Sequence, residues 1–253
     1  ALQGRGVGQI ISDSAELLRA HWRLWLGIGS PGVLLAGLSL LGLALSESSG
    51  LLSGVASLAT SLLIAVLTTL VTGATSQAVR LLDEQGQASV RECYRQVFAR
   101  FWPMLVTLVL FLGALVALTL SVYLSIVALV LTLGWSLWNA VVQVEDRTGI
   151  DALRRSWRLV RRQWLTVGAV VGLIALLAAF LGGLLATLAL VAVQLPPVMF
   201  HLIPGLTSVV LQPFAALLLI YAYFNGRTLE DEAIEGGAAS QAEPRGEQPA
   251  ISR

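Results

Sequence analysis

The side chains that could perform catalysis or hold a metal are few and lie far apart in the sequence. The chain contains two histidines, His21 and His201, and one cysteine, Cys93. A metal site needs a cluster of His, Cys, Asp or Glu ligands, and a nucleophilic hydroxyl or thiol needs a base beside it. Neither Ser14 nor Ser156 has a base at a readable spacing, and no G-x-S-x-G motif or glycine-rich phosphate loop occurs. We therefore expect no enzyme, no metal and no cofactor.

The most distinctive charged pattern is a run of arginines between residues 149 and 164. The apolar side chains of this segment recur every three or four residues and so share one predicted helical face: Ile150, Leu153, Trp157, Val160 and Trp164. The arginines occupy the rest of the helix: Arg154, Arg155, Arg158, Arg161 and Arg162. Basic amphipathic helices of this kind lie in the headgroup plane of a membrane. We expect these arginines to contact anionic lipid or an acidic membrane-protein partner, the plainer alternative being a helix that only sets topology.

Two earlier segments resemble this one, which indicates an internal threefold repeat. Each opens at a glycine, continues as an amphipathic helix, reaches a tryptophan and enters an apolar stretch. The three segments span residues 6–22, 86–102 and 149–164. Their tryptophans, which suit the edge of the apolar layer and its lipid contacts, are Trp22, Trp102 and Trp164. With the apolar stretches included, we expect repeats over about residues 6–80, 86–145 and 149–226.

The apolar stretches themselves place the chain in the membrane class. Charged residues make up 12% of the chain, against about 25% in soluble domains. Four long stretches contain no charge: residues 24–46, 48–79, 103–144 and 165–226. A helix crosses the bilayer core with about 20 apolar residues, so each of the last two stretches is long enough for two spans. We expect an all-α protein with six spans, with a kink at Pro31 in the first and a turn near residues 119–125 between the third and fourth.

Arginine placement predicts the orientation of these spans. All 16 basic residues are arginines, and they fall before span one, between spans two and three, between spans four and five, and after span six. By the positive-inside rule, both termini then lie in the cytoplasm, and we expect a bacterial inner-membrane location. The net charge of +1 gives no sign of nucleic acid, and we expect no such partner. We divide the chain into a membrane domain, residues 1–235, and a disordered tail, residues 236–253.

Polar groups inside the spans are few and uncharged. Because no ionisable residue lies within an expected span, proton-coupled or sodium-coupled transport is disfavoured. Asn139 and Gln143 lie one helical turn apart in span four and share a face. If the protein has a buried polar site, we expect this pair to form it, facing span two.

The sequence at residues 144–168 is the most specific part of the chain. It reads V-E-D-R-T-G-I-D-A-L-R-R-S-W-R-L-V-R-R-Q-W-L-T-V-G, and the chain opens with G-x-I-I-x-D-S-x-x-L-L-R-x-H-W at residues 8–22. Together with Ala-Tyr-Phe-Asn at residues 222–225, this resembles a six-span bacterial membrane-protein family. The family is similar to the membrane domain fused to some glycerophosphodiester phosphodiesterases. The resemblance covers roughly residues 6–235 and implies fold and location. In the fused proteins the hydrolase chemistry belongs to a separate soluble barrel, so we do not expect it here.

These observations favour a non-enzymatic function. We expect an inner-membrane scaffold or accessory protein in envelope or lipid homeostasis, with a basic cytoplasmic face that contacts anionic lipid or an acidic partner. The alternative is a facilitative transporter or channel for a lipid-like or uncharged small molecule, built around the buried polar pair.

Overall fold

The computed structural model describes residues 6–46, 51–119, 124–192 and 202–242, and these ranges contain helices and no strand. The helices are α1 (Val7–Ala20), α2 (Trp22–Gly29), α3 (Gly32–Ser46), α4 (Leu51–Gln85), α5 (Val90–Ala99), α6 (Phe101–Thr119), α7 (Ser125–Gly134), α8 (Trp138–Glu145), α9 (Gly149–Arg162), α10 (Trp164–Ala192) and α11 (Leu202–Ala242).

Six stretches of the described chain are helical, long and apolar enough to cross a membrane. They are Trp22–Gly42, Ser53–Gln85, Phe101–Leu118, Ile126–Glu145, Trp164–Leu185 and Leu206–Ile234. The predicted all-α, six-span class is therefore confirmed, and the chain is a multi-pass membrane protein. α6 ends at Thr119 and α7 begins at Ser125, and residues 120–123, where the turn between spans three and four is predicted, lie outside the described part of the chain.

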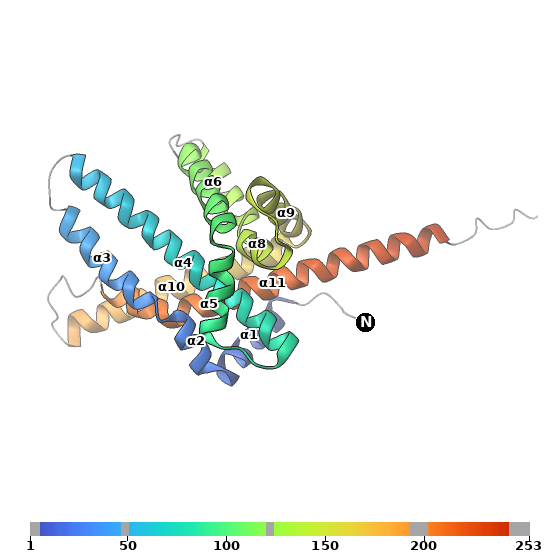
Figure 1. Cartoon of the computed structure of the whole chain (residues 1–253), viewed down its shortest axis with the longest axis horizontal. Coiled ribbons are helices and arrows are strands. Elements are labelled where there is room, and N and C mark those ends of the chain that lie inside the picture. The colour runs from blue at the N-terminus through green and yellow to red at the C-terminus, as the bar shows by residue number, and fades with distance from the viewer. Residues whose placement is uncertain (1–5, 47–50, 120–123, 193–201, 243–253) are drawn as a thin grey trace, which may run out of the picture.

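The helices pack most closely at one end of the molecule. In Figure 1 the pairs α3–α4, α6–α7 and α10–α11 extend outward from a centre where α5, α8 and α9 gather. Core residues at this centre, such as Val97 and Leu159, are fully buried, whereas Leu58 and Leu129 on the outer parts of α4 and α7 are more than two-thirds exposed. Lipid tails cover such exposed apolar side chains in a bilayer. We call the packed end, which carries α5 and α9, the arginine-rich end.

A single non-helical residue separates each of α1, α5 and α9 from the span that follows it. These junction residues are His21, Arg100 and Gln163. The φ and ψ angles are −125° and 37° at His21, −109° and 20° at Arg100, and −131° and 39° at Gln163. The three junctions thus turn the backbone in the same way, although the internal repeat itself stays a prediction.

Two of the spans are broken within their length. Ser30 and Pro31 separate α2 from α3, which agrees with the kink predicted at Pro31. A second break, between α7 and α8, is not predicted by the sequence. There the Ser156 hydroxyl donates to the Gly134 carbonyl at 3.0 Å, and a Cβ on Gly134 would lie 2.0 Å from the ring of Trp157. α9 therefore presses against the end of α7 so closely that only glycine fits.

The C-terminal end differs from the sequence-based expectation. α11 continues to Ala242, so residues 236–242 are helical where a disordered tail is predicted. Residues 243–253 lie outside the described part of the chain, as does His201.

Candidate functional site

The outward face of α9 carries the densest group of exposed arginines. Four of them, Arg154, Arg158, Arg161 and Arg162, are exposed. The opposite face packs into the protein through Ala152, Leu153, Ser156, Leu159 and Val160. Within the described ranges none of the four arginines forms an ion pair, whereas Arg80 pairs with Glu84 and Arg95 pairs with Glu92. Their guanidinium groups are therefore free to bind anions outside the protein. We call these four residues the α9 arginine face.

The packed face of α9 is rotated from the predicted apolar stripe. Leu153 and Val160 are buried as predicted, but Ile150 is 56% exposed. The small side chains of Ala152 and Ser156 are buried in its place. Small residues allow helices to approach closely, and the contact of Ser156 with the end of α7 requires such an approach. The exposed apolar edge is left for lipid.

Arg155 does not belong to the lipid-facing group, which corrects the sequence-based prediction. Its side chain is only 12% exposed, with Nε 2.9 Å from Glu145 Oε2 and a terminal nitrogen 2.6 Å from Glu230 Oε2. Tyr223 donates its hydroxyl to Glu145 Oε1 at 3.0 Å, and Arg147 pairs with the same carboxylate at 3.2 Å. Burial alone would lower the pKa of Arg155, but its bonds to the two carboxylates outweigh burial and raise the pKa. Arg155 therefore links α8, α9 and α11 as a permanent cation.

Neutralising Arg155 should destabilise the fold far more than neutralising its neighbour Arg158. The Arg155→Gln variant leaves Glu230 without its counter-charge and Glu145 with Arg147 alone, and breaking a buried pair costs about 3–5 kcal/mol. Arg158→Gln removes the same charge from an exposed position and should change stability by less than about 0.5 kcal/mol. Thermal unfolding of the two purified variants in one detergent measures the difference. Equal midpoints would contradict a structural role for Arg155.

The predicted polar pair, Asn139 and Gln143, is buried and faces α4 as expected. The Asn139 amide donates to the Thr69 carbonyl at 3.0 Å. The Gln77 amide donates to both the Gln143 side-chain oxygen and its carbonyl at 3.1 Å, and Arg100 donates to the same carbonyl. A Cβ on Gly73 would lie 3.1 Å from Gln143 Nε2. The pair is thus packed between helices and joins span four to span two.

Replacing Gln77 or Gln143 by leucine should destabilise the protein, and the two effects should not add. Each single variant removes the bond between the two side chains and leaves the remaining buried amide with one hydrogen bond fewer, which costs about 1–3 kcal/mol. The double variant removes both polar groups and should recover part of that loss. A double-mutant cycle on unfolding free energies measures the coupling. Purely additive losses would show that the amide pair contributes nothing as a pair.

A third polar contact joins the junction at Gln163 to α11. The Gln163 amide donates to the Ala222 carbonyl at 2.6 Å, and Asn225 donates to Gln163 Oε1 at 2.8 Å. A Cβ on Gly226 would lie 2.4 Å from Gln163 Nε2, so the amide fits against a bare backbone. The sequence does not predict this contact or the roles of Gln77 and Glu230, because each of these residues binds a residue that is far away along the chain.

The three predicted interfacial tryptophans differ in exposure. Trp22 is 54% and Trp102 72% exposed, and the Arg23 guanidinium lies 5.3 Å from the Trp22 ring centroid. Trp164 is half-buried and packs edge-on against Trp157 with 6.3 Å between ring centroids. Trp22 and Trp102 are therefore available to lipid over most of their surface, and Trp164 is shared between lipid and protein.

Cys93, the one thiol of the chain, is fully buried in the core against α4. Burial raises the pKa of this thiol to about 11. The reactive species of a cysteine is the thiolate, so Cys93 stays protonated and unreactive at neutral pH.

Cys93 should therefore resist alkylation in the folded protein. Two pKa units lower the thiolate fraction by about 100-fold, and lack of exposure slows the reaction further. N-ethylmaleimide at pH 7.5 should label native protein slowly and denatured protein rapidly. A matched control places a cysteine on the same helix in a Cys93→Ala background, at the exposed Ala99. Rapid native labelling of Cys93 would contradict its burial.

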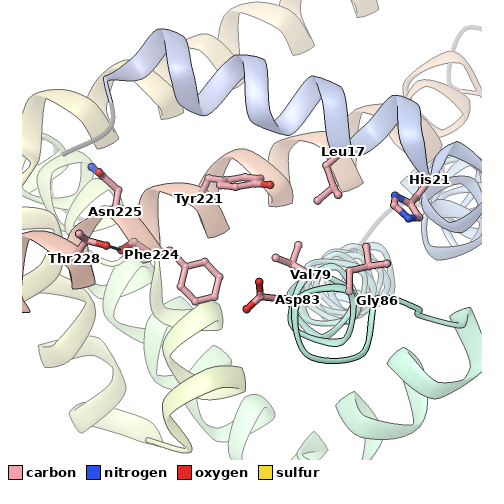
Figure 2. Close-up of a pocket in the computed structure, with 10 residues that line it drawn as sticks. Leu17, His21, Val79, Asp83, Gly86, Tyr221, Phe224, Asn225 and Thr228 are labelled. Carbon is pink, nitrogen blue, oxygen red and sulfur yellow. Dashed lines mark hydrogen bonds between the residues drawn. The ribbon is translucent and has the colours of Figure 1, made fainter. Parts of the chain in front are cut away.

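A cavity of about 460 Å³ lies between α1, α4 and α11. Figure 2 shows α1 crossing over it, with Val79 and Asp83 projecting from α4 and Tyr221 and Phe224 from α11. The full lining comprises Leu17, His21, Val79, Leu82, Asp83, Gly86, Tyr221, Phe224, Asn225 and Thr228. No sequence pattern predicts this cavity, because its lining comes from three segments that are distant in sequence.

Comparisons with known proteins do not assign a family. No family model, curated protein or solved structure matches the chain. Among the described residues, no group of three or more His, Cys, Asp or Glu could hold a metal ion. The argument for function therefore rests on the arginine face, the polar contacts and the cavity.

Proposed function

We propose that the protein is a non-enzymatic scaffold or accessory protein of a bacterial inner membrane, whose α9 arginine face binds anionic lipid headgroups. The supporting observation is that four arginines on one helix are exposed and, within the described ranges, unpaired. Each arginine near an anionic surface contributes about 1 kcal/mol of attraction. Four of them acting together would contribute about 4 kcal/mol, which is enough to select anionic over neutral lipid.

The surroundings of the α9 arginine face also suit a membrane surface. Exposed apolar side chains flank it: Ile150 is 56% exposed and Leu165, at the start of the next span, is 85% exposed. An apolar edge that enters the acyl region beside a row of arginines is the arrangement of an interfacial helix. Under the positive-inside rule this face and both termini lie in the cytoplasm, where anionic lipid gives the leaflet a negative surface potential.

The transporter alternative has less support. It requires Asn139 and Gln143 to line a path for substrate, but Asn139 donates to α4, Gln143 accepts from α4, and the space beside Gln143 is narrow. The suggested kinship with the six-span family of the fused phosphodiesterases remains part of the proposal, because it rests on residues 8–22, 144–168 and 222–225 alone.

Neutralising the α9 arginine face should reduce bound anionic lipid selectively. The test is gentle extraction of a tagged chain, with mass spectrometry of all lipid and protein that co-purify. We expect the variant with Arg154, Arg158, Arg161 and Arg162 changed to Gln to lose at least about tenfold in bound phosphatidylglycerol relative to phosphatidylcholine, since each 1.4 kcal/mol corresponds to tenfold. Added salt should weaken the wild-type preference, because exposed charges are screened.

A control with the same loss of charge separates this face from net charge. It carries Gln at four other exposed arginines, namely Arg19, Arg23, Arg91 and Arg95. This control should keep its anionic lipid. If both variants lose anionic lipid equally, the effect is one of net charge alone. If neither variant loses anionic lipid, the lipid proposal is overturned. A stoichiometric acidic protein that only the α9 variant loses would replace lipid as the partner.

A further inference from the structure

We propose that the cavity between α1, α4 and α11 binds a small amphiphile that carries an ammonium group. This inference is independent of the α9 arginine face. The volume of about 460 Å³ lies within the range of about 300–1,000 Å³ that is typical of small-molecule sites. α1 packs on α11 and α10, and the cavity lies between α1 and the end of α4 (Figure 2).

One of the three junction residues, His21, brings a buried nitrogen without a hydrogen-bond partner in the described part of the chain to this cavity. Arg100 and Gln163 each use their side chains to bind a neighbouring helix, Arg100 at the Gln143 carbonyl of α8 and Gln163 at the Ala222 carbonyl of α11. His21 holds the same place after α1 but lines the cavity. Its Nδ1 atom is buried and has no hydrogen-bond partner among the described residues. Buried polar atoms are rarely left unpaired, so a ligand that donates a hydrogen bond would satisfy it.

The charge of the lining selects a cation over an anion. Asp83 is the only carboxylate among the lining residues, and no arginine lines the cavity, although arginines crowd this end of the molecule. Asp83 forms no ion pair within the described ranges, and Figure 2 shows its carboxylate directed into the space between α4 and α11. An ammonium group placed there can donate to the Asp83 carboxylate. Hydrogen bonds between charged groups are about twice as strong as neutral ones.

The remaining lining suits a hydrocarbon chain. Leu17, Val79, Leu82 and Phe224 form apolar walls from all three helices. A molecule with an ammonium head and an alkyl body would therefore place its body against these walls and its head at the exposed carboxylate of Asp83. Two sources share this chemistry, a lipid with an ethanolamine headgroup and a free alkylamine.

The test is photo-crosslinking of the full chain in phosphatidylcholine nanodiscs with a decylamine that carries a diazirine. Mass spectrometry maps the labelled residues, and we expect label on the cavity lining, at Leu17, Leu82 or Phe224. Octylamine should compete, whereas octanol and octanoate should not, because only the amine can donate as a cation. Competition by octanoate equal to that by octylamine, or label spread evenly over the spans, would overturn the proposal.

Two variants test the assignment of the ammonium group. Asp83→Asn should raise the half-saturating probe concentration at least about tenfold, the effect of losing one charge-assisted hydrogen bond. Glu84→Gln removes the same charge from the next residue, which does not line the cavity, and should label like wild type. Leu82→Trp, which fills the space, should abolish labelling. Wild-type labelling of Asp83→Asn would refute the proposal even if the cavity binds alkyl chains.

A second membrane distinguishes the two sources of the amine. In nanodiscs that contain phosphatidylethanolamine, a lipid occupant would suppress labelling relative to phosphatidylcholine alone. If labelling is unchanged, the occupant is a free amine. Both results support an ammonium site and differ only in where the amine comes from.

Discussion

A charged side chain that leaves water needs its counter-charge within reach, and this constraint organises the arginine-rich end. Arg155 lies between Glu145 and Glu230, which belong to α8 and α11. Lipid tails are as apolar as leucine, so helices in a bilayer gain little from apolar burial against one another. Specific polar contacts must then hold the hairpins together. The Gln77–Gln143 and Gln163–Ala222 bonds supply two more.

Two groups of arginines at the arginine-rich end differ in a way that composition cannot show. One group forms ion pairs within the protein: Arg100 pairs with Asp146, Arg147 with Glu145, and Arg155 with Glu145 and Glu230. The other group, on the outer face of α9, has no partner among the described residues. Paired arginines fix helices in place, whereas unpaired ones attract whatever anion lies nearby. Within α9, Arg155 is therefore held by the fold, whereas Arg154, Arg158, Arg161 and Arg162 have no ion-pair partner among the described residues.

The sequence was sufficient for the spans but not for their contacts. Uncharged stretches and Pro31 located six spans and one kink because helix length and proline geometry are local properties. Asn139 and Gln143 could be assigned to the face toward α4 because polar groups avoid lipid. The orientation of Arg155 could not be predicted, since Arg154 and Arg155 give the same local signal and only the distant Glu230 decides between them. The break after Gly134 likewise depends on Trp157, which a local pattern cannot place.

The length of α11 has a consequence for anything attached to the C-terminus. Its 41 residues correspond to about 60 Å at 1.5 Å per residue, twice the thickness of the bilayer core of about 30 Å. The helix continues well past the other elements and projects from the packed end (Figure 1). A domain joined beyond Ala242 would be held away from the headgroups by the part of α11 that passes the bilayer.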